Sequence, residues 1–304
     1  MFLEQAYRGR NKWYLYLATL LIVFVSTQIG SIPLGVYALF HHISSGTDLA
    51  ASASDIMKTN LGFALMLIPF AAGLGVLVLC INKIHKKKTN DVITSRARID
   101  RKRIVFSALL WIGLSALSLT FDFYSESGKY ILQFDWGKFI PLFAITLVLI
   151  PLQTGLEEIV FRGYLMQGTA LLVRYKWVAL ILTSVAFGLM HSWNPEVEES
   201  GFWVAMPQYI LMGFIMGYAA LKDGGLELAL GMHAGNNIFS ALTVSSDISA
   251  LKTHAIFLDT APVIKASDSI FIIIYGLVFI LICRWKYGYA DGNNIRDKIL
   301  PPNK

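Results

Sequence analysis

Two adjacent carboxylates and an arginine lie at the end of an apolar stretch of this 304-residue chain. Glu157 and Glu158 follow residues 139–156, which read FIPLFAITLVLIPLQTGL, and Arg162 comes four positions after Glu158. On a helix, residues four apart share a face, so Glu158 and Arg162 are expected to form an ion pair. Glu157 is rotated by about 100° from Glu158 and can point elsewhere. The spacing therefore predicts a structural pair beside a free carboxylate.

Two further motifs bring imidazoles into apolar stretches. Phe187 and His191 are four apart in one stretch, and His233 and Asn237 are four apart in another. A charged side chain in hydrocarbon costs about 3 kcal/mol on insertion scales, so polar groups there are rare and are functional by default. The three motifs together are therefore interpreted as one site.

One carboxylate, two imidazoles and an amide could activate a water molecule against a carbonyl carbon. Glu157 would act as the general base, with His191 helping directly or with a metal in the group. Asn237 can only orient or donate, which fits the stabilisation of developing negative charge. No serine or cysteine stands beside a histidine in these motifs, which disfavours a covalent acyl-enzyme route. The HExxH pattern is absent too, so a metal site would need ligands from separate helices.

Each polar residue also has a structural interpretation. For Glu158 and Arg162 a purely structural ion pair is favoured over direct chemistry, whereas Glu157 has no obvious local partner and catalysis is favoured. A lone buried histidine such as His191 usually packs in the core with its hydrogen bonds satisfied. Polar motifs in three separate apolar stretches favour a functional role for it instead. The lysine run 86–88 is interpreted as an anchor to anionic lipid. The remaining histidines fall in loops or at span ends and are expected to be bystanders: His41, His42, His85 and His254.

Composition sets the class of protein. Hydrophobic residues make up 55% of the chain and charged residues 15%, against about 25% charged in ordinary soluble domains, and the mean hydropathy is +0.57. An all-α polytopic membrane protein is predicted, forming one integral membrane domain over residues 1–304. The pI of about 9.2 does not indicate a nucleic-acid partner, because the basic residues flank apolar runs. Cys80 and Cys283 lie within apolar spans, so no disulfide framework is expected.

About eight transmembrane helices are expected to enclose an intramembrane catalytic cavity. The first apolar stretch is overlong and carries Gly30, Pro33 and Gly35, so its helix is expected to end or bend near Ile32. No internal repeat is visible, so the inverted-repeat signature of many secondary transporters is missing. Each span has close to the roughly 20 residues that a bilayer requires, at residues 13–40, 60–82, 104–121, 139–156, 177–192, 203–221, 226–244 and 268–284.

Basic residues cluster on alternate sides of these spans. They precede the first span, fill the segment between the second and third, and follow the fourth, sixth and last, whereas one of the other loops carries Glu196, Glu198 and Glu199. The positive-inside rule then predicts that both termini are cytoplasmic. The first apolar run is too long for a cleavable signal peptide and lacks a convincing cleavage site.

The predicted depths of two site residues disagree. A rise of about 1.5 Å per residue from Phe139 puts Glu157 near the cytoplasmic edge, while His191, counted from Trp177, lies near or past mid-membrane. Strong tilt, a kink near Pro151 or a longer fourth helix could bring them together. The helices are then expected to converge on a water-filled cavity that opens toward the cytoplasm.

The ordered motifs EExxxR, FxxxH and HxxxN resemble the CPBP family of intramembrane proteases. That family includes the type II CAAX prenyl endopeptidases and bacterial relatives linked to bacteriocin immunity. The resemblance covers about residues 139–245, roughly a third of the chain, and the eight-span layout. It implies that Glu157 activates water with help from His191, and that His233 and Asn237 stabilise the oxyanion or help to hold a metal.

The same resemblance implies roles for the remaining motif residues and a cofactor. Glu158 and Arg162 would support the site, and Phe187 would line it. The family is usually described as metallopeptidases, which makes a divalent metal such as zinc a candidate cofactor, although the residues alone do not decide its part. Its ligands would be Glu157, His191 and His233.

The prediction is therefore an intramembrane endopeptidase in the bacterial plasma membrane, which hydrolyses a peptide bond near the membrane surface. Its partners would be the lipid bilayer and a peptide or protein substrate; a prenylated C-terminal tetrapeptide is the family's best-known target. Two alternatives stay open: a non-catalytic immunity or scaffold protein of the same fold, and a proton-coupled transporter that uses Glu157 as its proton carrier.

Overall fold

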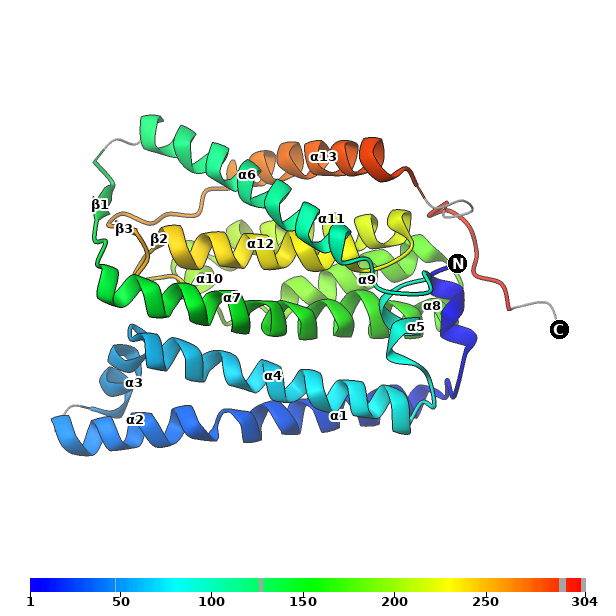
Figure 1. The fold of residues 1–304 in the computed structure, drawn as a ribbon, viewed down its shortest axis with the longest axis horizontal. Coiled ribbons are helices and arrows are strands. Elements are labelled where there is room, and N and C mark those ends of the chain that lie inside the picture. The colour runs from blue at the N-terminus through cyan, green and yellow to red at the C-terminus, as the bar shows by residue number, and fades with distance from the viewer. Residues whose placement is uncertain (47, 126–127, 290–293, 302–304) are drawn as a thin grey trace.

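A computed structural model describes residues 1–46, 48–125, 128–289 and 294–301. Over these residues the protein is a bundle of helices along one long axis, with three short strands at one end (Figure 1). The helices are η1 (Leu3–Tyr7), α1 (Trp13–Gly30), α2 (Ile32–Ser45), α3 (Leu49–Met57), α4 (Asn60–Lys83), α5 (Thr89–Ile93), α6 (Arg101–Ser125), α7 (Trp136–Glu158), η2 (Ile159–Leu165), α8 (Met166–Val173), α9 (Lys176–Leu189), α10 (Pro195–Ser200), α11 (Phe202–Asp223), α12 (Glu227–Thr243) and α13 (Asp268–Tyr287). The strands are β1 (Tyr130–Leu132), β2 (Val244–Ser245) and β3 (Phe257–Asp259).

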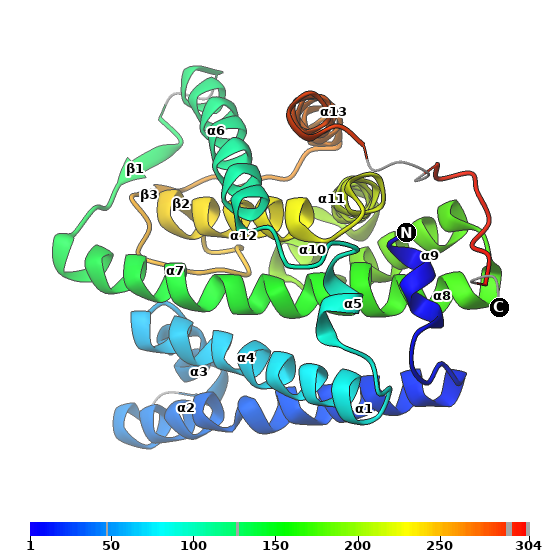
Figure 2. The same cartoon turned by 45° about the vertical axis from the view of Figure 1, so that its right-hand side comes forward.

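The long helix α7 lies at the centre of the bundle. In both views α1, α2, α3 and α4 lie on one side of it, and α6, α12 and α13 lie on the other (Figures 1 and 2). η1 and the last turn of α13 lie at the same end of the bundle (Figure 1). This arrangement agrees with both ends of the chain being on one side of the membrane; that this side is the cytoplasm stays a prediction.

Six helical segments of the described residues are long and apolar enough to cross a membrane. The protein is therefore an integral membrane protein, and the predicted all-α polytopic class is confirmed. The other two predicted spans are also helices, α9 with 14 residues and α12 with 17. At about 1.5 Å per residue, both are shorter than the roughly 30 Å hydrocarbon core. The six are Trp13–Ser45, Asn60–Lys83, Arg101–Ser125, Trp136–Val173, Phe202–Asp223 and Asp268–Tyr287.

The first predicted span divides where the sequence indicated a bend. α1 ends at Gly30, and α2 begins at Ile32 with Pro33 in its first turn, where a missing N–H leaves no helical hydrogen bond unmade. A Cβ atom on Gly30 would lie 2.8 Å from the Pro69 Cα. The glycine therefore allows α1 to approach α4 closely.

The fourth predicted span continues well beyond its expected end at residue 156. α7 passes into the π-helical segment η2 directly after Glu158, and η2 passes into α8, so one apolar run reaches from Trp136 to Val173 over 38 residues. π-Helical turns within α-helices occur frequently at functional sites. The carboxylate pair thus lies inside a long helix, at the point where its winding changes.

Glycines on α12 hold it close to α6. A Cβ atom on Gly231 would lie 2.0 Å from the Ile104 carbonyl oxygen, and one on Gly235 would lie 2.6 Å from the Ala108 carbonyl oxygen. No real side chain fits at such distances. Small residues four apart are a common way to bring membrane helices together, and here they set the position of the helix that carries His233.

Gly213 and Gly217, also four apart, do the same for α11 and α9. A Cβ atom on Gly213 would lie 3.0 Å from the Ser184 carbonyl oxygen, and one on Gly217 would lie 2.5 Å from Leu180 Cδ1. This pair therefore permits close packing of α11 against α9.

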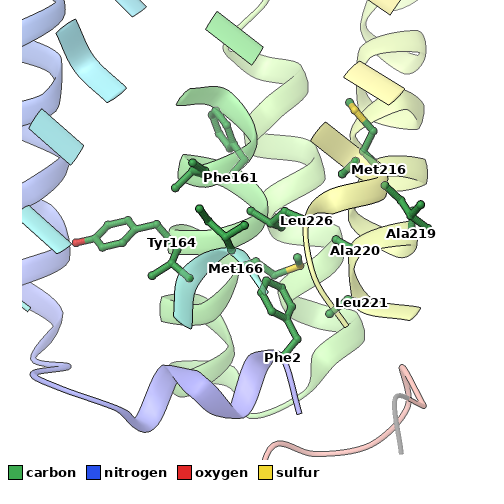
Figure 3. Packing of buried hydrophobic residues seen from close by; sticks show 14 of the residues in the cluster. Phe2, Phe161, Tyr164, Met166, Met216, Ala219, Ala220, Leu221 and Leu226 are labelled. Atoms are coloured by element: carbon green, nitrogen blue, oxygen red, sulfur yellow. The ribbon is translucent and has the colours of Figure 1, made fainter. Parts of the chain in front are cut away.

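The N-terminal segment folds back onto η2 and α8. Phe2 and Leu3 are 1% exposed and belong to the same apolar cluster as Phe161 and Met166. Figure 3 shows the Phe2 ring among the side chains of this cluster. Burying two large apolar side chains is worth about 1.5–3 kcal/mol each, so this segment is part of the core.

Lys87 contradicts the interpretation of the lysine run as a lipid anchor. Its side chain is 6% exposed, and Nζ donates to the Ala6 carbonyl oxygen and to Gln167 Oε1, both at 3.3 Å. Lys86 and Lys88 are exposed. Exposure alternates along the three lysines because the backbone leaves the helix after Lys83. Lys87 points inward, and its two hydrogen bonds link the N-terminal segment to α8.

His85 takes no part in the candidate site, yet it is fully packed. Nδ1 lies 2.8 Å from the Arg10 carbonyl oxygen and Nε2 lies 2.6 Å from the Tyr164 hydroxyl. Burial lowers the pKa of this imidazole. His85 is therefore a structural residue rather than a bystander in a loop.

A small sheet closes the end of the bundle opposite η1 (Figure 1). Its strand order is β1-β3-β2, with β1 antiparallel to β3 and β2 parallel to it. Ile131 pairs with Leu258, and Val244 pairs with Phe257. β1 and β2 are thus the two edge strands.

Candidate active site

The two adjacent carboxylates face one histidine ring. His233 Nδ1 lies 2.7 Å from Glu158 Oε1, and His233 Nε2 lies 3.6 Å from Glu157 Oε2. Arg162 donates to Glu158 Oε1 at 2.5 Å, so the ion pair expected from the spacing is present. Glu158 is fully buried and Arg162 is 1% exposed. The guanidinium compensates a carboxylate that burial would otherwise penalise heavily.

The contact with Glu158 fixes the proton on His233. An ionised carboxylate can only accept hydrogen bonds, so His233 Nδ1 carries a hydrogen, and Nε2, which faces Glu157, is unprotonated whenever the ring is neutral. Glu157 Oε2 is buried without a hydrogen-bond partner among the described residues. Two acceptors that face each other across 3.6 Å suit a shared water molecule that donates a hydrogen bond to each.

Gln153 joins Glu157 to Asn237. Gln153 Nε2 donates to Glu157 Oε1 at 2.6 Å, and Asn237 Nδ2 donates to Gln153 Oε1 at 3.1 Å. The chain continues from Asn236 Nδ2 to Asn237 Oδ1 at 3.1 Å and from Trp111 Nε1 to Asn236 Oδ1 at 3.0 Å. The expectation that Glu157 lacks a local partner was therefore wrong. The amide of Asn237 is thus linked to the carboxylate through Gln153.

His191 lies just beyond the end of α9. Its Nδ1 is 2.8 Å from the Phe187 carbonyl oxygen, so Nδ1 donates and Nε2 stays available. Among the described residues no hydrogen bond or ion pair joins His191 to Glu157, but the two lie close enough to interact electrostatically. His191 thus borders the carboxylate without touching it.

Phe187 packs against both imidazoles. Its ring centroid lies 4.7 Å from that of His191 and 5.8 Å from that of His233. The Arg162 guanidinium carbon lies 3.8 Å from the same ring, a cation–π contact. The structure thus brings together all seven residues of the three sequence motifs, with Phe187 in the middle.

Tyr209 of α11 stacks on the His191 ring. The centroids are 4.5 Å apart and the planes differ by 20°. The Tyr209 hydroxyl donates to Glu196 Oε1 at 2.5 Å, and Asn194 Nδ2 donates to the same hydroxyl at 3.1 Å. A third carboxylate, that of Glu196, therefore holds the aromatic ring that stacks on His191.

The depth conflict is resolved by the longer fourth helix. Because α7 continues through η2 into α8, Glu157 lies 22 residues into a 38-residue run rather than at its end. His191, just after the short helix α9, lies near this carboxylate. Of the three explanations offered by the sequence, the longer fourth helix is present in the structure.

Some site residues were not found from the sequence. Gln153 precedes Glu157 by four positions, so the same helical spacing that predicted the ion pair could have identified it. Tyr209 and Glu196 carry no comparable signal, because their contacts join α10, α11 and the segment after α9. Only the folded chain brings them together.

The predicted metal ligands offer suitable donor atoms but lie too far apart to act together. Carboxylate oxygen and imidazole nitrogen are donors that zinc accepts, and Glu157 Oε2 and His233 Nε2 face each other. The described residues nevertheless contain no group of three His, Cys, Asp or Glu side chains close enough together to hold a metal ion. As they are arranged, Glu157, His191 and His233 do not form a three-ligand centre, and a role for metal stays a prediction.

Comparison with known proteins bears on the same segment. Residues 136–239 match the family model described as Type II CAAX prenyl endopeptidase Rce1-like. This segment of the chain is similar to that family. It contains all three motifs, so the resemblance inferred from them is confirmed.

A curated relative is similar to this chain over a longer stretch. The chain is 32% identical over 168 residues to Uncharacterized protein YyaK of Bacillus subtilis (strain 168). The match covers 55% of this chain and 56% of the relative, so the chain spans just over half of that protein's length. The Rce1-like segment thus indicates a CAAX-type intramembrane protease or a related fold.

Proposed function

We propose that the protein is an intramembrane endopeptidase in which Glu157 activates a water molecule. The observation that carries this proposal is the His233 ring, held by Glu158 with its Nε2 facing the unsatisfied Glu157 Oε2 at 3.6 Å. A water that donates to both acceptors from one side would be oriented and polarised. Positioned acid–base groups of this kind contribute about 10²–10⁴-fold to rate.

The steps follow from the side chains present. Glu157 removes a proton from the water as its oxygen attacks the carbonyl carbon of the peptide bond. The carbon–nitrogen bond then breaks, and the nitrogen takes the proton from Glu157. The Nε2 atom of His191 has no hydrogen-bond partner among the described residues. When Nε2 is protonated, it can donate a hydrogen bond to the carbonyl oxygen of the substrate. One water is consumed, and one carboxyl and one amino group are formed.

The surrounding residues position rather than react. Gln153 and Asn237 hold Glu157 Oε1, which leaves Oε2 for water. Asn237 Nδ2 donates one of its two hydrogens to Gln153, which leaves the other for the oxyanion role implied by the resemblance. Tyr209 fixes the plane of His191.

A bound divalent metal would supply a Lewis acid for the carbonyl or the water. We keep zinc as a prediction with Glu157 and His233 as the two facing donors. Measurement of metal content in purified wild-type protein and in Glu157→Gln tests it: metal in the wild type that is lost in the variant supports a bound ion, and equal content in both contradicts it.

We further propose a peptide or protein substrate, which a lipid group can anchor in the bilayer, and a bacterial plasma membrane with both termini cytoplasmic. The rival scaffold and transporter functions use the same fold differently. A scaffold would function with Glu157→Gln, and a proton-coupled transporter would lose uptake into sealed vesicles rather than cleavage.

The deciding experiment compares membrane proteomes of cells that make the wild type, Glu157→Gln or Glu198→Gln. Glu198 is an exposed acid of α10, so its variant makes the same change of charge outside the site. We expect new peptide termini with the wild type and Glu198→Gln that disappear with Glu157→Gln. Identical termini in all three membranes would contradict the proposal.

A further inference from the structure

A cavity of about 450 Å³ lies on the other side of α12 from the carboxylates. α6, α11, α12 and α13 form its walls, and Trp111 and Asn236 line its inner part. The motif residues Glu157, His191 and His233 do not line it. It is a separate space that adjoins the candidate active site.

Two stripes of polar residues face this cavity. On α6, Ser115, Ser118 and Asp122 follow Trp111 at helical spacing, and all line the space. α12 contributes Asn236 together with Ser240 and Thr243, again at intervals of four and three residues. The rest of the lining is largely apolar and includes Leu114, Leu119, Met212, Phe239, Phe271 and Ile272, so the cavity is amphipathic.

These hydroxyl groups need partners. Polar groups away from water cost several kcal/mol when left unsatisfied. No described hydrogen bond involves the side chains of Ser115, Ser118 or Ser240, and each lines the cavity. The space therefore offers hydroxyl groups to the polar groups of a ligand, beside apolar side chains that suit the ligand's apolar parts.

The charge of the lining is negative. Asp122 lies near the end of α6 and Asp268 is the first residue of α13, so both lie toward one end of the bundle. No lysine or arginine is among the residues that line the cavity. Asp268 Oδ2 accepts from the Lys265 backbone N–H at 2.8 Å, which orients the carboxylate without neutralising its charge. A cationic group is the complementary ligand.

Two edge strands meet the same cavity. Tyr130 begins β1 and Val244 begins β2, and both residues line the space. Edge strands can pair with an added extended segment through backbone hydrogen bonds. This feature favours a peptide over other cationic molecules.

The inner end of the cavity connects to the reacting group. Asn236, which lines it, receives a hydrogen bond from Trp111 and donates to Asn237. Asn237 reaches Glu157 through Gln153. A ligand that contacts Asn236 is therefore three side chains away from the carboxylate.

We propose that this cavity binds an extended peptide segment of the substrate that carries a basic residue. The segment's backbone amides pair with the serine, threonine and asparagine side chains, and its lysine or arginine lies near Asp122 and Asp268. The inference rests on the proposed function, because it assigns a substrate-binding space to the same hydrolase. It is tested here without cleavage.

Cysteine labelling tests whether the space is aqueous and acidic. The purified full-length protein carries Ser118→Cys and is reconstituted in nanodiscs. Leu117→Cys is the matched control, because Leu117 lies on the outward face of the membrane-spanning helix α6, away from the cavity. Thiols react as thiolates and so need water. We expect Ser118→Cys to react about tenfold faster than Leu117→Cys with a methanethiosulfonate reagent. Native Cys80 and Cys283 are both buried and provide the baseline.

Charge preference is measured with a trimethylammonium and a sulfonate form of the same reagent. The cationic form is expected to label Ser118→Cys about fivefold faster, and Asp122→Asn with Asp268→Asn should remove that preference. Equal labelling of positions 117 and 118, or no preference between the two reagents, overturns the proposal of an acidic polar space.

Peptide binding is measured as protection. A ten-residue glycine–serine peptide with a central lysine should slow labelling of Ser118→Cys, whereas the same peptide with glutamine should not. Both peptides are tested on protein that carries Glu157→Gln together with Ser118→Cys, so cleavage does not interfere. Protection by neither peptide, or by both equally, overturns the inference. Protection by the lysine peptide alone, with no cleavage by any form of the protein, supports the binding space and contradicts the hydrolase.

Discussion

His233 donates through Nδ1 to Glu158 Oε1 at 2.7 Å, and this contact decides which nitrogen faces Glu157. Glu158 therefore has two functions: it neutralises the buried Arg162 and sets the tautomer of His233. The sequence predicted a structural role for Glu158, and its contact with Arg162 agrees with that role, but Glu158 also determines which nitrogen of His233 carries a hydrogen.

Glu158→Gln separates these two functions. The glutamine oxygen can still accept from His233 Nδ1, but the Arg162 charge is left uncompensated, which costs about 3–5 kcal/mol in buried pairs. We expect a clear fall in the thermal unfolding temperature of the purified protein. Glu158→Gln with Arg162→Met removes both charges and should recover most of that loss. A double variant as unstable as the single one would show that the charge is not the cause.

Gln153 and Asn237 are expected to act as one unit. Gln153→Ala leaves Glu157 Oε1 without its amide donor, and Asn237→Ala removes the donor to Gln153. Each change should lower kcat about 10–100-fold, and the double variant should be little worse than Gln153→Ala. A double-mutant cycle on kcat measures the coupling, which we expect to exceed about 1 kcal/mol. Additive effects would mean that Asn237 acts independently.

The sequence predicted the helices and motifs but not the links between them. Periodic contacts within one helix, such as Glu158 with Arg162, follow from spacing alone. The run from Trp136 to Val173 was cut short because Glu157, Glu158 and Arg162 resemble the polar end of a span, and their burial depends on α9, α11 and α12. Lys87 was misjudged for a related reason, since only the packing of the N-terminal segment shows that its amine turns inward.

Tyr209 tests whether the plane of His191 matters. Tyr209→Phe keeps the stacking but loses the bond to Glu196, while Tyr209→Leu loses both. We expect a graded fall in kcat, about threefold and about thirtyfold, with KM nearly unchanged because the substrate does not need this ring to bind. Equal effects of the two substitutions would place the role in the hydroxyl alone. Loss of protein from the membrane fraction would instead indicate a folding role.

Gly231 tests the contact between α6 and α12. Gly231→Ala would place a Cβ 2.0 Å from the Ile104 carbonyl oxygen and so push α12, with His233, away from its neighbour. Gly113→Ala on α6 is the control, because nothing lies within 4 Å of the added atom. We expect Gly231→Ala to lower thermal stability by about 1–3 kcal/mol and to reduce cleavage, with Gly113→Ala close to the wild type. Comparable stabilities would contradict close packing of these two helices.

Lys87 gives the protein a pH dependence that can be isolated. Burial lowers the pKa of Lys87 to about 8 in the folded protein, against about 10.4 in an unfolded chain. Between these values the unfolded chain binds more protons, so stability rises as the pH increases from about 8 to 10, and below about 8 the full penalty of burying the charge is present. We expect the apparent melting temperature in detergent to rise over this window in the wild type. The rise should be smaller in Lys87→Met and unchanged in Lys88→Met, which alters an exposed neighbour. If Lys87→Met follows the wild type over the same pH range, the slope comes from other groups and the amine is not held in its buried position.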